Sequence, residues 1–281
     1  MKIVVTGGSG FIGTAVVNRL REDGHTVTGF DSRQGGDVRD PAACLERIDG
    51  ADVVVHLAGV LGTDELFDQV QHAVDVNVTG TVNVLDACAK AGARYCAVTM
   101  PPVFPSVYTA TKVAAQRLAS AYHHSRDLPV SHVRAYNAYG SGQANGPGHP
   151  RKIIPAFACE AWSGRPLTIW GDGLQTVDLV HVDAIADVFA AAVHVGDDTV
   201  IDAGTGHAMS VLDVAELVLT VTGSRAGLRH LPMRRGEVPT AIRAEAEGWH
   251  LLTPAQRPRW DPELLAETVI AYRDHPTAQA A

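Results

Sequence analysis

The stretch Thr6-Gly7-Gly8-Ser9-Gly10-Phe11-Ile12-Gly13 joins a short apolar run, residues 2–6, to an amphipathic run, residues 11–23. Its glycine spacing is that of a phosphate-binding turn between a strand and a helix. Gly7 permits the tight turn, Gly10 lets backbone N–H groups approach a pyrophosphate, and Gly13 lets the helix pack against the strand. The helix N-terminus directs its partial positive charge at the phosphates. The stretch therefore predicts a dinucleotide-binding strand–helix unit.

An acidic residue, Asp31, ends the second predicted strand, where such units bind the adenosine ribose. Its carboxylate would accept hydrogen bonds from both ribose hydroxyls and repel a 2′-phosphate, which favours NAD over NADP. Arg33 is the counter-argument because its guanidinium can reach a 2′-phosphate, although it can equally be a solvated loop residue. NAD is the predicted cofactor.

Short apolar runs alternate with longer helical patterns through the first half of the chain. The predicted strands are residues 2–6, 25–31, 52–57, 94–99 and 130–136, and the predicted helices are residues 11–23, 41–47, 64–91 and 107–126. Parallel neighbours need crossover connections, so this alternation predicts βαβ units. The expected fold class is α/β, a Rossmann-type doubly wound parallel sheet with a smaller C-terminal substrate-binding lobe.

A Gly/Pro-rich stretch, residues 141–150, interrupts the alternation and predicts a loop. The elements expected beyond it are helices at residues 153–163, 183–195, 211–222 and 262–273, with strands at residues 166–170, 177–181 and 199–202. We expect an NAD-binding domain over residues 1–140, to which residues 177–203 return. Residues 141–176 and 204–281 are expected to form the substrate-binding lobe.

The composition excludes several classes of protein. The chain has 281 residues, 46% of them hydrophobic, and a formal charge of −8, which disfavours binding to a nucleic-acid backbone. No apolar run is long enough to span a membrane, and the N-terminus lacks the pattern of a signal peptide. Four cysteines without a CxxC pair fit a reduced, cytoplasmic protein. The scattered histidines form no metal motif, so no metal is expected.

A tyrosine and a lysine, Tyr108 and Lys112, lie four residues apart on the predicted helix 107–126 and therefore share a face. A chance pair of this kind is rare because the chain has only four lysines. An ammonium beside a phenol lowers the pKa of the phenol. Tyr108 is therefore predicted to take the proton of a substrate alcohol while a hydride leaves for the nicotinamide.

With these motifs the sequence resembles the extended short-chain dehydrogenases, in particular the NAD-dependent epimerase/dehydratase family of nucleotide-sugar enzymes. The resemblance runs from residue 2 to about residue 192, and more faintly to residue 260. The segments that resemble family segments are the glycine turn, Gly36–Asp40, His56–Gly59, Asn77–Thr81, Arg134–Gly140, Pro166–Val182 and Arg234–Glu237.

The resemblance implies roles for individual residues. The expected cofactor contacts are Gly7, Gly10, Phe11, Ile12, Gly13, Asp31, Ser32, Arg33, Asp37, Val38, Leu57, Ala58, Gly59, Asn77, Tyr108 and Lys112. Asn137 and Arg234 are the expected substrate contacts, at the phosphates of a nucleotide-sugar. The catalytic residues expected are Tyr108, Lys112 and Thr99.

The sequence departs from the family where the strand at residues 94–99 ends. The family has Ser or Thr there, which hydrogen-bonds the reacting oxygen, whereas alignment places Met100 at that position. A thioether cannot donate a hydrogen bond. Thr99, one residue earlier, would point to the opposite face of a regular strand. A local shift of the strand could still bring the Thr99 hydroxyl into the site, or the hydroxyl of Ser106 or Thr109 could replace the missing one.

Three further departures concern the substrate. Only residues 100–107 connect the strand to the catalytic helix, where the family has a substantial substrate-covering loop, and Pro101, Pro102 and Pro105 stiffen this connection. Pro101 and Pro102 also stand where dehydratases and decarboxylases of the family place acids. Val177 replaces a family arginine that contacts the substrate diphosphate.

Epimerisation is the predicted activity because transient oxidation of a sugar hydroxyl, with Tyr108 as base and hydride transfer to NAD, needs no second acid or base. The alternatives are an NAD(P)-dependent dehydrogenase or reductase, a dehydratase or decarboxylase on an atypical substrate, and a non-catalytic NAD-binding protein. The amphipathic runs 64–91 and 107–126 either pair across a homodimer axis or only cover the sheet.

Overall fold

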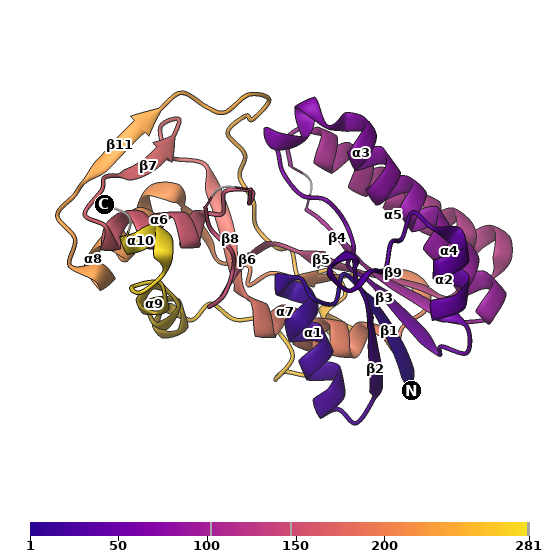
Figure 1. Ribbon diagram of the computed structural model, residues 1–281. Coiled ribbons are helices and arrows are strands. Elements are labelled where there is room, and N and C mark those ends of the chain that lie inside the picture. The colour runs from indigo at the N-terminus through magenta and orange to yellow at the C-terminus, as the bar shows by residue number, and fades with distance from the viewer. Residues whose placement is uncertain (102, 147, 280–281) are drawn as a thin grey trace.

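A six-stranded parallel sheet forms the centre of the computed structural model, which describes residues 1–101, 103–146 and 148–279. Its strand order is β2-β1-β3-β4-β5-β9 (Figure 1). The bounds are β1 Lys2–Thr6, β2 Thr26–Phe30, β3 Val53–His56, β4 Arg94–Thr99, β5 Val130–Ala135 and β9 Asp197–Ala203. The predicted Rossmann-type fold is confirmed.

Helices cover both faces of this sheet because alternate apolar side chains of each strand point in opposite directions. In β1, Ile3 and Val5 pack with helices α1 (Phe11–Glu22) and α7 (Val182–Ala192). Val4 packs on the other face, with α2 (Pro41–Ile48) and α4 (Gly80–Ala91), and α5 (Val107–Arg126) lies beside them.

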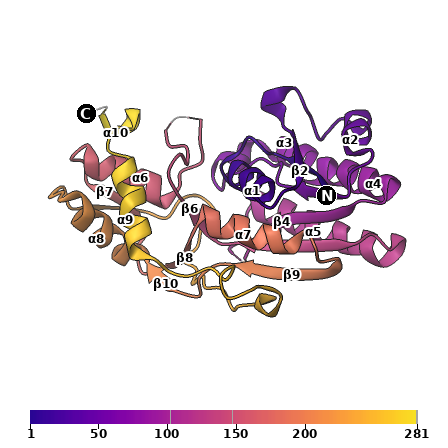
Figure 2. The ribbon, with the colours of Figure 1, turned by 90° about the horizontal axis from the view of Figure 1, so that it is seen from below.

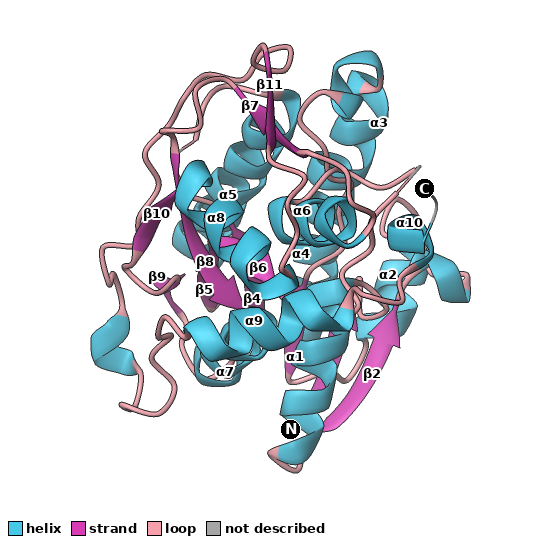
Figure 3. Ribbon diagram, turned by 90° about the vertical axis from the view of Figure 1, so that its left-hand side faces the viewer, coloured by secondary structure: helices cyan, strands magenta, loops and turns pink. Residues whose placement is uncertain are grey.

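A small lobe lies beyond the carboxyl ends of the parallel strands (Figure 2). Its strands are β6 Asn137–Tyr139, β8 Thr176–His181 and β10 Ala208–Ser210 in one sheet, and β7 Leu167–Trp170 and β11 Leu228–Leu231 in another. Its helices are α6 Ile153–Trp162, α8 Val211–Thr222, α9 Pro262–Ala271 and α10 Pro276–Gln279 (Figure 3). They pack around a second apolar cluster, which includes Leu167, Leu179 and Val214.

The segment from residue 177 to residue 203 divides between the two sheets. Strand β9 joins the edge of the six-stranded sheet beside β5, and α7 packs on that sheet. Strand β8, in contrast, pairs with β6 and β10. The domain boundaries given above remain a prediction, whereas the two-lobed arrangement follows from these pairings.

The predicted helix over residues 64–91 is confirmed over residues 70–91, which are helical without a break, but the whole stretch consists of four elements of different type. They are a 3₁₀ turn, Glu65–Asp68, then α3 Val70–Val74, a π-helical turn, Asp75–Thr79, and α4. A π turn inserts a residue into the helical repeat, and such turns are frequent at functional sites. The buried Asn77 lies within it.

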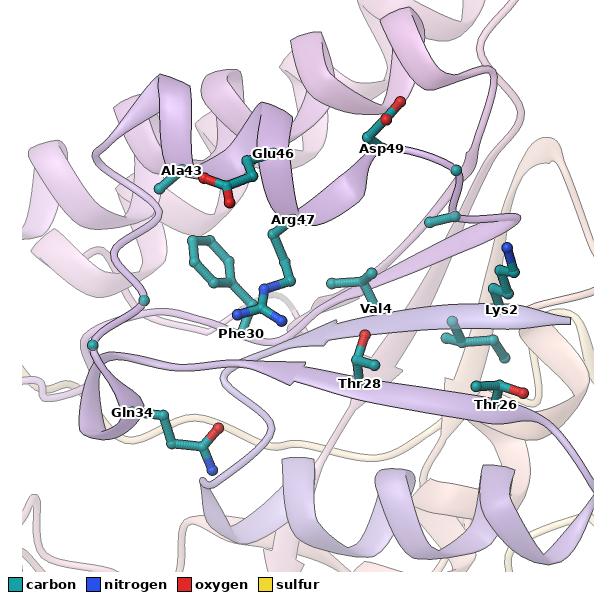
Figure 4. A pocket seen from close by; sticks show the side chains of 15 residues that line it. Lys2, Val4, Thr26, Thr28, Phe30, Gln34, Ala43, Glu46, Arg47 and Asp49 are labelled. Atoms are coloured by element: carbon teal, nitrogen blue, oxygen red, sulfur yellow. The ribbon is translucent and has the colours of Figure 1, made fainter.

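Strand β2 lies at the edge of the six-stranded sheet, where a Rossmann fold of order 3-2-1-4-5-6 has one strand more. Only residues 31–40 connect β2 to α2, which leaves no room for that strand and its crossover. A hollow opens beneath this edge, and Figure 4 shows Thr26, Thr28 and Arg47 around it. Its lining includes no residue of the glycine turn or of α5.

No helix in the described part of the chain is long and apolar enough to cross a membrane. The four cysteines, Cys44, Cys88, Cys96 and Cys159, are buried and unbonded to one another.

Candidate active site and cofactor cradle

The glycine turn connects β1 to α1 with no space for side chains at two of its glycines. Gly7 has φ 68°, and a Cβ there would lie 2.7 Å from the backbone nitrogen of Ala58. A Cβ at Gly13 would lie 2.2 Å from the carbonyl oxygen of Gly7. Gly10 caps α1 without a side chain, so the first N–H groups of the helix have no acceptor from the cap. These groups fit a pyrophosphate.

Asp31 is held in place by two backbone donors. Its carboxylate accepts from the N–H of Ser9 at 3.0 Å and from that of Arg33 at 2.9 Å. Each carboxylate oxygen keeps a further lone pair for a ribose hydroxyl. The Arg33 guanidinium donates to the Ser9 carbonyl oxygen at 2.9 Å, so it lies against the glycine turn. Ser32 begins the short 3₁₀ turn that Asp31 caps.

The predicted adenine-binding pair, Asp37 and Val38, lies beside the start of α4. Arg39 donates from its backbone N–H and its guanidinium to the Asp37 carboxylate and holds the pKa of that carboxyl below its usual range. The Val38 carbonyl oxygen accepts from the Asn83 side chain at 2.9 Å. A Cβ at Gly80 would lie 2.7 Å from the Val38 side chain, so α4 and this loop are in close contact.

A buried histidine, His56, fixes the backbone that follows β3. Thr81 donates its hydroxyl proton to the Asn77 carbonyl oxygen, so the nearby Nε2 of His56 must be the donor to Thr81. Nδ1 then accepts from Thr6, whose oxygen also accepts from the N–H groups of Leu57 and Ala58. Burial lowers the pKa of His56 to about 3, which keeps the ring neutral.

Asn77 links three parts of the site from the π turn. Its amide oxygen accepts from the Val60 N–H at 2.8 Å, and its amide nitrogen donates to the Val60 carbonyl oxygen and to the Thr111 hydroxyl. Gly59 leaves room for this contact, because a Cβ there would lie 3.0 Å from the Asn77 oxygen. Thr111 adjoins Lys112, so Asn77 ties α5 to the loop that follows β3.

Tyr108 and Lys112 lie one turn apart at the start of α5, whose N-cap is Ser106. Burial lowers the pKa of Lys112 to about 8 and raises that of Tyr108 to about 12. The expected lowering of the phenol pKa is therefore not found in the polypeptide itself, because desolvation disfavours both charged forms. A tyrosine and a lysine with shifted pKa values, one helical turn apart, are typical of functional sites.

The hydroxyl groups considered as replacements at Met100 are engaged elsewhere. Thr99 is 3% exposed and donates to the Gln116 side-chain oxygen at 2.7 Å. Ser106 accepts from the Thr109 N–H, and Thr109 donates to the Phe104 carbonyl oxygen. Pro102, one of the three prolines of this connection, lies outside the described residues.

The hydrogen bond of Thr99 leads to a testable prediction. Because its hydroxyl proton goes to Gln116, we expect Thr99→Val to lower stability by about 1 kcal/mol and kcat by less than about 10-fold. Gln116→Leu, which removes the acceptor, is the matched variant. Thermal melts and steady-state rates are the measurements, and a fall in kcat of about 100-fold in Thr99→Val would make Thr99 a catalytic residue.

The two predicted substrate contacts lie on the small-lobe side. Asn137 begins β6, where it pairs with Leu179. Arg234 follows β11, and one of its terminal nitrogens bonds Glu237. The Arg234 Nε is buried and has no partner among the described residues. Val177, at the position of the family arginine, is 9% exposed and belongs to the small-lobe core.

Other polar groups at this side of the site were not predicted. Trp170 lies with its ring centroid 6.0 Å from the Arg234 guanidinium, and its Nε1 is buried without a partner in the described part of the chain. Lys152 precedes α6, and burial lowers the pKa of its ammonium group. The sequence positions of Trp170 and Lys152 match no motif, so neither residue could be distinguished from an ordinary core or surface residue. Within residues 1–101, 103–146 and 148–279, no cluster of three or more His, Cys, Asp or Glu side chains could hold a metal ion.

The chain is similar to a known protein family, to characterised enzymes and to solved structures. The model of the NAD dependent epimerase/dehydratase family matches residues 3–100 and 97–204. The UDP-glucose 4-epimerase of Mycolicibacterium smegmatis is 28% identical over 85% of this chain and 88% of its own. MoeE5, solved with UDP-glucose and NAD, is 27% identical, with a TM-score of 0.86 over 97% of this chain and 99% of that one. The dTDP-glucose 4,6-dehydratase DesIV of Streptomyces venezuelae is 26% identical, with a TM-score of 0.83 over 98% of both chains.

Proposed function

The chain belongs to the NAD-dependent epimerase/dehydratase family, and we propose that it is an epimerase that inverts a hydroxyl-bearing carbon in the sugar of a nucleotide-linked substrate. The observation that carries this proposal is the pair Tyr108 and buried Lys112, one turn apart on α5, a helix that Asn77 ties through Thr111 to the loop after β3. The chain's similarity to the epimerase of Mycolicibacterium smegmatis and to MoeE5 supports it.

The residues of the cradle fit NAD. The glycine turn and the N-terminus of α1 would hold its pyrophosphate, Asp31 its adenosine ribose, and Lys112 its nicotinamide ribose. NAD, when bound, supplies the hydride acceptor for a sugar carbon. The preoriented backbone of Leu57 and Ala58 would line the same cleft.

Tyr108 is the proposed base, and its oxygen takes the proton of the sugar hydroxyl and later returns it. The positive charge of Lys112, one turn away, favours the phenolate that this step requires. Oxidation and reduction at one carbon balance, so the reaction needs no further proton donor. This suits a site where Met100 and Pro101 stand at the positions of hydroxyl and acidic groups, because neither side chain moves a proton.

The proposal is tested by incubating the purified protein with NAD and separate UDP-, dTDP- and GDP-hexoses. Chromatography and proton NMR would identify an inverted sugar, and absorbance at the NADH band would monitor the cofactor. We expect one inverted product and no net NADH. The absence of turnover with every sugar would contradict the proposal.

A net dehydrogenase or reductase acting on a non-sugar alcohol or ketone is the second candidate. Two observations favour it: the short connection from β4 to α5, and Val177, which is buried in the small-lobe core and leaves one phosphate-binding cation fewer. Steady accumulation of NADH in the same assay would support this candidate over the epimerase.

Asp31 predicts the cofactor preference. We expect Asp31→Ser to reduce the preference for NAD over NADP by at least about 10-fold, because the repulsion of a 2′-phosphate disappears while Arg33 remains beside the glycine turn. Cofactor titrations measure this. Asp261→Ser is the control, because Asp261 also caps a helix with its carboxylate, but does so at α9 in the small lobe. If Asp31→Ser kept the wild-type preference for NAD over NADP, the Asp31 carboxylate would not be the cause of that preference.

Two finer features complete the proposal. We place the enzyme in the cytoplasm, on the ground of its reduced cysteines. We also propose a homodimer through the outer faces of α4 and α5, where Val113 is 47% exposed. Light scattering of the purified protein measures the latter.

A further inference from the structure

The outer edge of strand β2 carries backbone groups that have no partner in the described part of the chain. Within its sheet β2 pairs with β1 alone. The Thr26 N–H donates to the Met1 carbonyl oxygen at 3.0 Å, so the backbone groups of Thr26 face β1. Because these groups alternate in direction along a strand, those of Val27 and Gly29 face outward. Among the described residues only the Val27 carbonyl oxygen has a partner there, the Arg21 guanidinium at 3.2 Å.

The opposite edge of the same sheet is covered by the chain itself. The Asp202 N–H of β9 donates to the Glu247 carbonyl oxygen at 2.9 Å, and a Cβ at Gly248 would lie 2.5 Å from the Val200 carbonyl oxygen. The segment around residues 247 and 248 therefore lies against the outer side of β9 (Figure 2). The sheet is thus closed at one edge and open at the other.

The sequence of β2 has no feature that protects an open edge. Its five residues, Thr-Val-Thr-Gly-Phe, include no charged residue and no proline, which are the usual devices against pairing with another strand. Thr26 and Thr28 are exposed and line the hollow between β2 and α2. A regular, uncharged edge of this kind is a template for a further strand.

Charges of both signs surround the hollow beneath this edge. Its lining includes two cations, Lys2 and Arg47, and two acids, Glu46 and Asp49 (Figure 4). The chain as a whole carries a formal charge of −8, so two copies repel each other on approach. Around β2 the two signs balance, and each copy offers acids to the cations of the other. This pattern favours a second copy of the chain over a basic or an acidic partner.

We propose that β2 pairs in antiparallel fashion with β2 of a second copy, about a two-fold axis that passes beside Thr28. The outward groups fix this register, because Val27 then lies opposite Gly29 of the partner subunit. Each such pair exchanges two backbone hydrogen bonds, which gives four across the axis. The Val27 carbonyl oxygen has two lone pairs, so it can keep its bond from Arg21.

The two-fold axis places Thr28 directly opposite Thr28 of the partner subunit. This central position is one without hydrogen bonds between the two residues, where Cα atoms lie about 4.5 Å apart and side chains touch. The partner strand occupies the place of the outer strand that the sheet lacks, and the two six-stranded sheets become continuous. The lining of the hollow includes no residue of α4 or α5, so this interface is distinct from the one proposed on those helices.

The register is tested by cross-linking of Thr28→Cys under mild oxidation with diamide, followed by non-reducing electrophoresis. Thr26→Cys is the matched control, because Thr26 is an exposed threonine on the same face of the same strand. In the proposed register its thiol lies about 13 Å from its symmetry mate, too far for a disulfide. The native cysteines are buried, so each variant has one accessible thiol. We expect Thr28→Cys to dimerise covalently at least about 10-fold faster. Equal rates, or no disulfide in either variant, would overturn the proposal.

Light scattering of the full-length protein tests the association without a cross-link. Thr28→Lys should halve the molar mass of the wild-type assembly, because it sets two like charges directly opposite each other. Thr28→Val, which keeps the backbone pairing, should retain the wild-type mass. A monomeric wild type, or an unchanged mass in Thr28→Lys, would contradict the pairing of β2.

A substitution on α5 separates this interface from the other one. Val113→Lys changes the outer face of that helix, where Val113 is 47% exposed. Added to Thr28→Cys, it should leave the rate of disulfide formation within about 2-fold of that in the single variant. A loss of the disulfide in the double variant would assign the contact to α5 and overturn the proposal.

Discussion

Tyr108→Phe is expected to lower kcat by about 10³-fold or more while NAD still binds, because removal of the base leaves the cradle intact. The hydroxyl group of Tyr108 makes no hydrogen bond to a described residue, so its loss should not destabilise the fold. Turnover of the active nucleotide-sugar, NAD affinity and thermal melting are the three measurements. Together they separate a chemical role from a structural one.

Tyr122→Phe is the control for this prediction because Tyr122 lies on the same helix and uses its hydroxyl group at the surface, on Asp86. It should retain wild-type turnover. A biological output that survives Tyr108→Phe but not the loss of NAD binding would support the third alternative, a non-catalytic NAD-binding protein. Unchanged turnover in Tyr108→Phe would remove the tyrosine from the mechanism.

The parts of the fold that could be predicted from the sequence are those encoded by local patterns. The glycine turn, the alternation of strands and helices and the pairing of Tyr108 with Lys112 each depend on residues a few positions apart. Steric demands at Gly7 and Gly13 are equally local, because the neighbouring chain closes on both of them. Such local patterns can be recognised in the sequence without knowledge of tertiary contacts.

The parts that could not be predicted depend on distant contacts. The helical pattern over residues 64–91 conceals the π turn, because Asn77 bonds the backbone of Val60 and the side chain of Thr111, which are remote in sequence. The direction of the Thr99 hydroxyl was likewise set by Gln116 on another element.

The edge position of β2 is a further feature that could not be predicted from the sequence. Residues 31–40 contain the acid, the 3₁₀ turn and the adenine-binding segment expected of the fold, so each motif was identified. The missing strand leaves no residue pattern of its own, and it becomes evident only from the strand order. The predicted position of Asp31 does not require an outer neighbour for β2, because the carboxylate is held by the backbone of the glycine turn.

The second large effect is expected from a substitution in the glycine turn, where a side chain at Gly13 should weaken NAD binding. Gly13→Ala would place a methyl group 2.2 Å from the Gly7 carbonyl oxygen, far inside contact distance, and both groups belong to the backbone. Either α1 or the turn must move, and the N–H groups that face the pyrophosphate move with it. We expect NAD affinity to fall by about 100-fold or more, since pyrophosphate contacts depend on close backbone approach. Titration of NAD and differential scanning calorimetry measure this.

A control at the other end of the same helix separates this effect from general destabilisation. Gly24 follows α1 with φ 79°, and a Cβ there meets no atom within 4 Å. Gly24→Ala should therefore cost about 1 kcal/mol through its backbone conformation alone and leave NAD binding unchanged. If Gly13→Ala lost stability but bound NAD as tightly as Gly24→Ala does, the glycine turn would be a packing feature and the pyrophosphate would bind elsewhere. Retained stability with lost NAD binding would assign the turn to the cofactor.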